Sequence, residues 1–339
     1  MNFSLRLGLV IGVVAAFGGA IAYLSAGDQG LAAAHKTRWE SSVQCKSCHE
    51  DVYAEWTGSH HQIAFTNPEV RKLSDDFRKE ECMDCHLPRP LVITGFGSRT
   101  LPRRTHFDEG ISCISCHLGP DGGLLARNDR PEVPCAPKRS TDFLAVKSCE
   151  SCHNQHWTTD QWRASPYAAQ GTDCASCHMP EVTRVRKDGS KRMGRGHVFH
   201  GSHDVATLKK AGKFEVARAG SEVALTLTNT GAGHNYPTEE RHRAVDMLYR
   251  FVTADQETGG EWTLAYRFRM PYRDESTPVG PGADVQENTQ LPAFATKTVN
   301  VPIPAGAVAV ETRLWYRLTP FCGDDSPLST LLEERRVDL

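Results

Sequence analysis

Residues Cys174-Ala-Ser-Cys-His178 hold two cysteines three positions apart, followed at once by a histidine. This Cys-x-x-Cys-His pattern occurs five times between residues 45 and 178. The copies are Cys45/Cys48/His49, Cys82/Cys85/His86, Cys113/Cys116/His117, Cys149/Cys152/His153 and Cys174/Cys177/His178. The repeat determines how the first half of the chain folds, because the residues between the five copies must surround the groups that these copies bind.

The pattern matches the chemistry of covalent haem attachment. Two thiols at this spacing add to the two vinyl groups of one haem, and the adjacent histidine is then placed under the iron. A single copy is also compatible with a redox-active dithiol or half of a zinc site. Five copies, each with its histidine, argue strongly against both. We therefore predict a multihaem c-type cytochrome with five covalently attached haem c groups.

The oxidation state of the remaining cysteines depends on the compartment in which the protein resides. Ten of the 12 cysteines belong to the pattern, which leaves Cys135 and Cys322. Haem attachment and an export signal predict an oxidising, extracytoplasmic compartment, where these two thiols can form a disulfide. The alternative, which we favour, is a buried free thiol at each position.

An apolar segment near the N-terminus predicts a membrane anchor. Leu7 to Gly27 are 21 residues without a charge, preceded by Arg6. This length is close to the roughly 20 residues that span a bilayer. We expect residues 1–30 to hold the protein on the periplasmic side of the bacterial inner membrane. A signal peptide cleaved near Ala32-Ala33-Ala34, which would give a soluble periplasmic protein, is the alternative. No cysteine follows the segment, so a lipoprotein anchor is excluded.

The charge balance argues against nucleic acid as a partner. The side chains carry a formal net charge of −2, and ionised haem propionates would make the holoprotein distinctly acidic. The basic runs Arg103-Arg104 and Arg184 to Arg195 are interpreted as groups that neutralise propionates or frame a docking surface. A solvated hairpin around Asp188-Gly189 is the alternative for the second run.

The chain is predicted to form two domains behind the anchor. Residues 35–205 hold every haem motif and little hydrophobic periodicity, so we expect short helices and irregular loops around stacked haems. Residues 206–325 alternate apolar and polar residues at period two, which predicts an antiparallel β-sandwich. A C-terminal tail, 326–339, is expected to contain a short helix from Leu331 to Arg336. The predicted strands lie at 213–218, 222–228, 244–252, 261–268, 296–303 and 307–318.

Ten further histidines are candidates for the second axial position of each iron. They are His35, His60, His61, His106, His156, His197, His200, His203, His234 and His242. His106 lies just ahead of the third motif, and His234 lies in the Gly-rich turn Gly231-Ala-Gly-His234. Histidine is preferred throughout over methionine, since it gives lower reduction potentials.

Several motifs resemble the superfamily of cytochrome c-554-like electron carriers and, more distantly, hydroxylamine oxidoreductase. The matching stretches are Trp56-x-x-Ser59-x-His61, Glu109-Gly-Ile-Ser-Cys113, Cys174-Ala-Ser-Cys-His-Met-Pro180 and His197-x-Phe-x-Gly201-x-His203. The resemblance covers about residues 40–205 and implies that His61, rather than His60, is a distal ligand. It likewise points to His197 and His203, with His200 as the spare. A weaker likeness extends to the β-domain.

Two departures from that superfamily leave the ligand pairing open. Its tetrahaem carriers have four motifs, whereas this chain has five. The stretch Trp162-Arg-Ala-Ser165-Pro-Tyr167 has a tyrosine where the first copy has His61, and we interpret Tyr167 as a packing residue rather than a ligand. One iron then finds its partner in His156 or His234, or stays five-coordinate. The predicted distal set is His61, His106, His197, His203 and His234.

These features predict electron transfer between a membrane or periplasmic donor and redox protein partners, within a respiratory complex. We expect no catalytic residue. The alternative is a haem enzyme acting on a small nitrogen or sulfur compound at one open iron, with Arg163, Tyr167 and His156 beside it. A third hypothesis makes the β-domain a binding module within a larger complex.

Overall fold

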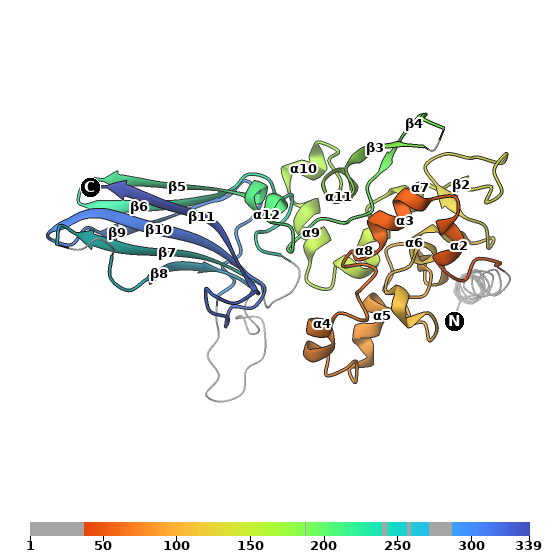
Figure 1. Cartoon of the computed structure of the whole chain (residues 1–339), viewed down its shortest axis with the longest axis horizontal. Helices are drawn as coiled ribbons and strands as arrows, with labels where there is room; N and C mark the ends of the chain where they lie inside the picture. Colours follow the sequence, from red (N-terminus) through yellow and green to blue (C-terminus); the bar gives the residue numbers. More distant parts are fainter. Residues whose placement is uncertain (1–36, 187, 239–242, 256–258, 271–286) are drawn as a thin grey trace, which may run out of the picture. The chain divides into compact units, whose positions relative to one another are not determined.

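The structure of the chain is a computed structural model that describes residues 37–186, 188–238, 243–255, 259–270 and 287–339 (Figure 1). The predicted anchor at 1–30 lies outside the described residues. Among those that are described, no helix is long and apolar enough to cross a membrane. The contacts divide the chain into two compact units. Unit 1 is Met1–Cys152 with Met179–Phe199, and unit 2 is His153–His178 with His200–Leu339.

Unit 1 consists of short helices joined by irregular loops. Its helices do not exceed seven residues in the described part of the unit, as expected for a chain interrupted by Gly and Pro. They are α2 (Val43–Lys46), α3 (Glu50–Trp56), α4 (Pro68–Leu73), η1 (Glu80–Cys82), α5 (Met83–His86), η2 (Leu91–Ile93), η3 (Phe107–Glu109), α6 (Cys113–His117), α7 (Thr141–Leu144) and α8 (Lys147–His153).

Two small sheets complete unit 1. Strands β1 (Leu125–Ala126) and β2 (Lys138–Arg139) pair in parallel. Strands β3 (Glu181–Val185) and β4 (Lys191–Arg195) form an antiparallel hairpin. Among its described residues, Phe77, Met83 and Leu87 form a small buried apolar cluster. The expectation that cofactors supply much of the buried apolar area stays a prediction.

Unit 2 joins four short helices to two antiparallel sheets. The helices are α9 (Thr158–Arg163), α10 (Pro166–Ala169), α11 (Cys174–His178) and α12 (Val205–Ala211). One sheet has the order β5-β6-β9 and the other β11-β10-β7-β8. Their strands are β5 (Gly212–Ala219), β6 (Glu222–Asn229), β7 (Ala244–Thr253), β8 (Thr263–Phe268), β9 (Thr296–Pro302), β10 (Ala307–Arg317) and β11 (Ser329–Asp338). The fifth motif therefore groups with the strands. The predicted border at residue 205 stays a prediction.

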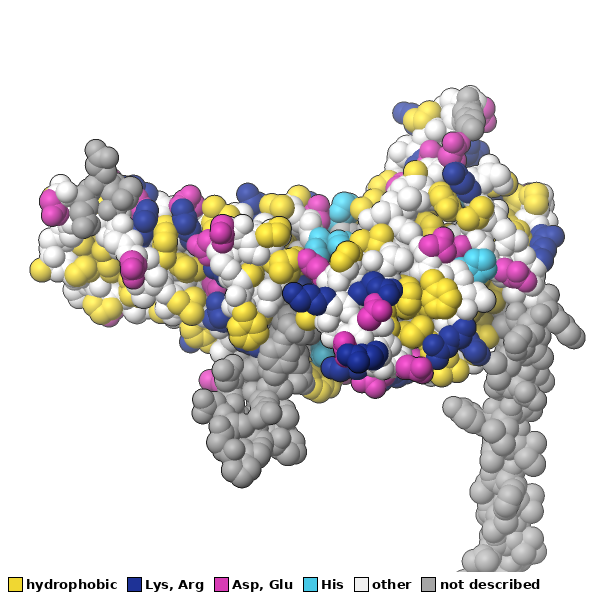
Figure 2. Space-filling model, turned by 60° about the horizontal axis from the view of Figure 1, so that its bottom comes forward, with side chains coloured by type: hydrophobic (Ala, Val, Ile, Leu, Met, Phe, Trp, Pro, Cys, Tyr) yellow, Lys and Arg dark blue, Asp and Glu magenta, His cyan; other side chains and the backbone are white. Residues whose placement is uncertain are grey.

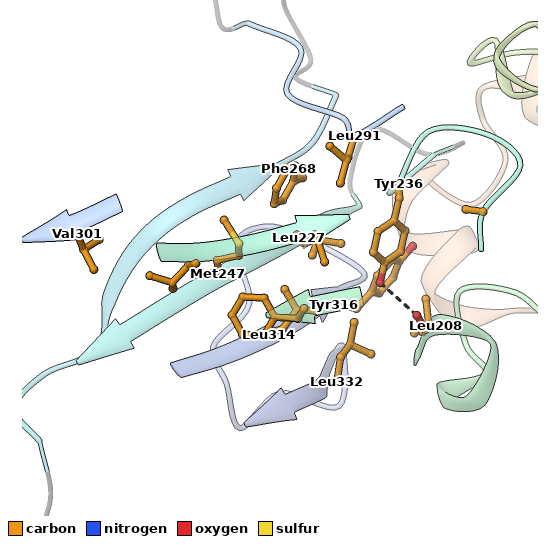
Figure 3. Close-up of a cluster of buried hydrophobic side chains, with 14 of the residues drawn as sticks. Leu208, Leu227, Tyr236, Met247, Phe268, Leu291, Val301, Leu314, Tyr316 and Leu332 are labelled. Atoms are coloured by element: carbon orange, nitrogen blue, oxygen red, sulfur yellow. Dashed lines mark hydrogen bonds between the residues drawn. The ribbon is translucent and has the colours of Figure 1, made fainter. Parts of the chain in front are cut away.

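Both sheets contribute to one apolar core (Figure 3). Strand β6 alternates strictly between half-buried and buried residues, with Val223, Leu225 and Leu227 fully buried. Met247, Phe268 and Leu314 meet them from the other sheet. The prediction of short helices followed by antiparallel strands is confirmed, while the finer prediction of a sandwich remains a prediction. Charged side chains of both signs are scattered over the visible surface, in keeping with the low net charge (Figure 2).

The predicted helix from Leu331 to Arg336 is wrong, since these residues lie in β11. Strand β11 pairs antiparallel with β10 over its whole length. Its charged residues, which looked like a helix surface in the sequence, instead bond across strands: Arg313 to Glu334 and Arg336 to Glu311. Pairing along the edge of a sheet therefore outweighed local helix propensity.

A buried ionic network holds β7, β8 and β10 together. Asp246 is 1% exposed and accepts hydrogen bonds from Arg267 at 2.6 and 2.7 Å and from Arg317 at 2.6 Å. Arg317 also donates to Asp324 and to the hydroxyl of Ser329. Because each charge is paired, the network satisfies the polar groups that it takes out of water.

Replacing Asp246 by alanine leaves the buried guanidinium of Arg317 with one carboxylate fewer. We expect the Asp246→Ala holoprotein to lose about 3 kcal/mol of unfolding free energy, measured by urea denaturation followed by circular dichroism. Asp255, an exposed residue of the same unit that accepts a hydrogen bond from Thr253, provides the control. An Asp246→Ala loss no larger than that of Asp255→Ala would contradict the stabilising role.

Candidate haem sites

The repeated cysteines lie on short helical turns, most of which end at the histidine. Helices α5, α6, α8 and α11 finish at His86, His117, His153 and His178. Residues three and four apart lie on one face of a helix. Each of these turns can therefore present thiols and one imidazole to the same ligand.

The first motif departs from this arrangement at Cys48. Cys45 lies in α2, but that helix ends at Lys46, and His49, with φ −121° and ψ 45°, leaves the helical backbone before α3 begins. Cys48 is therefore presented by the turn between the two helices. Its side chain is exposed, whereas that of Cys45 is half-buried, and its Sγ lies 3.8 Å from the hydroxyl of Ser47.

Cys177 is also exposed, although it lies within α11. The remaining eight attachment cysteines are half-buried: Cys45, Cys82, Cys85, Cys113, Cys116, Cys149, Cys152 and Cys174. Haem attachment at Cys48 stays a prediction, as it does at the other nine.

Three of the motif histidines have their ring orientation fixed by a backbone carbonyl. Nδ1 of His86 lies 3.0 Å from the oxygen of Ala64, Nδ1 of His117 lies 2.8 Å from that of Leu125, and Nδ1 of His178 lies 2.6 Å from that of His200. A carbonyl oxygen only accepts, so Nδ1 carries the proton in the neutral ring. Nε2 then carries the lone pair, which is the arrangement found at metal-binding histidines.

Two further histidines show the same arrangement. Nδ1 of His197 donates to the oxygen of Arg195 at 2.9 Å, and Nδ1 of His234 donates to that of Asn235 at 2.9 Å. Both belong to the predicted distal set.

Each of these two rings faces a histidine of the repeat. The centroids of His117 and His197 lie 6.3 Å apart with an interplanar angle of 27°, and those of His178 and His234 lie 6.2 Å apart at 12°. A metal–imidazole bond is about 2.0 Å long, and a five-membered ring has its centre about 1.1 Å behind the bound nitrogen. Imidazoles on opposite faces of one iron thus have centroids about 6.2 Å apart. Both pairs fit two axial ligands of one haem.

Burial keeps these rings uncharged. It lowers the pKa values of His117 and His178, and it lowers that of His197 to about 4. Burial, followed by the charge of Arg192, also lowers the pKa of His49. A neutral imidazole is the form that binds a metal ion, so the electrostatics agree with the geometry.

An ion pair positions His197. Arg184 donates two hydrogen bonds to Glu55, at 2.7 and 2.6 Å, and a third to the oxygen of Arg195. The carboxylate of Glu55 also accepts the backbone N–H of His197 at 2.9 Å. Burial raises the pKa of Glu55, but the hydrogen bonds from Arg184 and His197 outweigh it and lower the pKa overall. The carboxylate therefore stays charged and ties α3 to the segment that carries the ring.

A tightly packed turn positions His234. The buried amide of Asn229 donates to the oxygens of His234 and Leu291 and accepts the N–H of Ala232. A methyl group at Gly231 would lie 2.0 Å from the oxygen of Lys210, so only glycine fits there. The turn leaves His234 little freedom to move away from His178.

The attachment cysteines also show which sites are neighbours. The side chains of Cys45 and Cys113 lie close enough to affect each other's pKa values, and that of Cys85 lies close enough to raise the pKa of Cys152. The first site therefore adjoins the third, and the second adjoins the fourth.

A buried carboxylate joins the first and third sites as well. Glu109 accepts hydrogen bonds from the amide and the hydroxyl of Ser42, and that hydroxyl accepts the N–H of Cys113. The contact fixes the start of α6 against the start of α2.

Comparison with known proteins agrees with this geometry. Residues 44–118, which contain the first three motifs, match the family model described as cytochrome c554 and c-prime. The fold resembles the crystal structure of a penta-heme cytochrome c552 from Thermochromatium tepidum, with a TM-score of 0.64. The two sequences are 19% identical, and the match covers 88% of this chain and 99% of the other. No curated protein matches the sequence.

The chain is thus similar in its first three motifs to cytochrome c554 and c-prime, and in its fold to a penta-heme cytochrome. The thiols and imidazoles of the repeat are the groups that covalent attachment of haem c requires.

Three other predicted ligands lie in different surroundings. His61 packs against Phe199, with ring centroids 4.0 Å apart. His106 lies 3.9 Å from Glu109, and His203 is exposed. Their ligand roles stay predictions.

Tyr167 makes packing contacts, in agreement with its interpretation as a packing residue. Its hydroxyl donates to the oxygen of Thr230, and its ring stacks on Phe294. Cys135 and Cys322 are both free thiols and half-buried.

Sequence reasoning missed the residues that hold the ligands. Glu55 carries no motif signal, and Arg184 was grouped with a basic run although its side chain turns inward to Glu55. Glu109 was noted only as part of a resemblance, without its role beside Ser42. A charge that pairs over more than a hundred residues cannot be recognised from its neighbours in the sequence.

Removing the Glu55 carboxylate is expected to loosen His197. The Glu55→Ala holoprotein should lose about 2 kcal/mol of unfolding free energy and show a shifted or broadened low-spin EPR signal from one haem. Glu181, which pairs with Arg127 at the surface, is the matched control. An unchanged EPR spectrum in Glu55→Ala would show that the ion pair does not orient the ligand.

Gly231→Ala is expected to displace His234 and convert one haem from low-spin to high-spin, because the new methyl group collides with backbone. Near-infrared magnetic circular dichroism measures the change. Gly260, where an added methyl group meets nothing within 4 Å, is the control. A Gly231→Ala protein that folds and keeps all its low-spin haems would rule out His234 as a ligand.

Proposed function

We propose that this protein binds five haem c groups and relays electrons between a membrane or periplasmic donor and a redox protein partner. The observation that carries the proposal is the pair of facing imidazoles, His117 with His197 and His178 with His234, at iron-binding separation. Five motifs in the sequence support the haem number. The proposed proximal ligands are His49, His86, His117, His153 and His178.

Paired histidine ligands favour electron transfer over chemistry on a substrate. The haem, when bound, supplies a one-electron couple whose potential depends on its axial ligands and surroundings. The protein holds both imidazoles through carbonyl hydrogen bonds and the Glu55–Arg184 pair. A site built in this way keeps the same ligands in both oxidation states and leaves no iron face for a substrate.

The observed contacts weigh against the catalytic hypothesis. Tyr167 is engaged with Thr230, and Arg163 pairs with Asp160. These were two of the three residues suggested for an open iron. The proposed distal ligands for the other three haems remain His61, His106 and His203.

Location and assembly belong to the same proposal. Haem c attachment and the apolar segment at residues 7–27 support delivery to the periplasm. Retention of that segment as an inner-membrane anchor, or its cleavage, are the two proposed outcomes, and a respiratory complex is the proposed setting. The formal net charge of −2 favours a protein partner over nucleic acid, and the basic hairpin β3–β4 is a candidate surface for that partner.

Counting haems and their spin states tests the proposal. We expect mass spectrometry of the holoprotein to give five haem masses, and EPR with near-infrared magnetic circular dichroism to show five low-spin irons with two histidine ligands each. Nitrite, hydroxylamine, cyanide and CO should leave the spectra unchanged. A high-spin iron that responds to one of these molecules would instead support the enzyme hypothesis.

A further inference from the structure

The hairpin β3–β4 has an outer face that is unusually apolar for a surface element. The register pairs Thr183 with Met193 and Val185 with Lys191, so these four side chains share one face. Val185 is 62% exposed and Met193 66% exposed. Single exposed apolar residues are ordinary, but these two are diagonal neighbours across the strands, where side chains are within reach of each other.

Exposed basic residues lie next to Val185 in this hairpin. Lys191 pairs with Val185 across the strands, and Arg186 follows Val185 in the chain. The whole segment 181–195 contains more Lys and Arg residues than acidic ones. Figure 2 shows yellow and dark blue side chains side by side on the projection at its upper right, where unit 1 carries this hairpin (Figures 1 and 2).

The opposite face fixes the hairpin next to two haem sites. Arg184 points inward to Glu55, whose carboxylate also holds the N–H of His197. Arg192 and Arg184 are close enough to His49 to act on it electrostatically. The hairpin thus links an exposed surface directly to a ligand of the third haem site and lies beside the first.

We propose that the outer face of β3–β4, with Val185 and Met193 at its centre and the exposed Arg186 and Lys191 beside them, is the docking surface for an acidic redox protein. A small apolar centre inside a charged rim is typical of transient interfaces, which are below about 1,200 Å². Positive charge selects a partner with negative charge around its own cofactor and speeds encounter. The inference rests on the proposed electron relay, because docking matters only if an electron then passes: one electron leaves the partner and one ferric iron is reduced.

Stopped-flow reduction of the holoprotein by a reduced, acidic plant-type [2Fe–2S] ferredoxin tests the surface. We expect the double variant Arg186→Glu/Lys191→Glu to lower the second-order rate constant about tenfold at low ionic strength. The difference should vanish at about 1 M salt, where charges are screened within about 3 Å. The variant Val185→Ser/Met193→Ser should weaken binding about tenfold with little change in salt dependence. Lys209→Glu/Arg218→Glu, exposed basic residues of unit 2, is the control with the same change of charge.

Each outcome either supports or overturns the proposed docking surface. Equal rate constants for the wild type, the hairpin variant and the control overturn the docking surface. A wild-type dimer in sedimentation velocity, or binding to phosphatidylglycerol vesicles, that is lost in Val185→Ser/Met193→Ser overturns it as well, since the face is then covered by a second copy or by lipid. The proposed electron relay is tested separately, by the low-spin haem count and by complete reduction with dithionite. Failure of the relay can therefore be distinguished from failure of the docking surface.

Discussion

A hydrogen bond from histidine Nδ1 to a backbone carbonyl is the contact on which the proposed haem sites depend. It is present at His86, His117, His178, His197 and His234. The bond fixes the tautomer and the direction of the ring together, which no side-chain packing achieves as sharply. Loops that look irregular are therefore constrained, since each must bring one particular carbonyl to one particular imidazole.

The carbonyl partners come from both irregular and regular backbone. Those of Ala64 and His200 lie outside the helices and strands, whereas those of Leu125 and Arg195 lie in β1 and β4. Short helical turns place most of the cysteines, and the intervening segments supply the groups that orient the rings. The Glu55–Arg184 pair and the Glu109–Ser42 contact then connect segments that are distant in the sequence.

Local patterns in the sequence allowed part of this structure to be predicted. The Cys-x-x-Cys-His spacing identified the candidate attachment sites, and the period-two alternation identified strands such as β6. His197 and His234 were predicted as ligands, and both face a histidine of the repeat.

The failures have a common physical cause. The C-terminal helix failed because β11 is stabilised by pairing with β10, which local propensity does not report. The roles of Glu55 and Arg184 were not predicted for a related reason, because their partners are brought close only in the folded chain.

Iron coordination by the facing histidine pairs would also lower the conformational entropy of the unfolded chain. An iron held by His178 and His234, or by His117 and His197, joins residues far apart in the sequence and closes a loop, as a disulfide does. For loops of this length such a cross-link removes chain entropy worth about 4 kcal/mol from the unfolded state. Cys135 and Cys322 form no disulfide in this structure, and under the proposed ligation the two histidine pairs would supply the long-range cross-links. Loss of a distal ligand would then change the reduction potential of a haem and, because the loop is no longer closed, also reduce the stability of the fold.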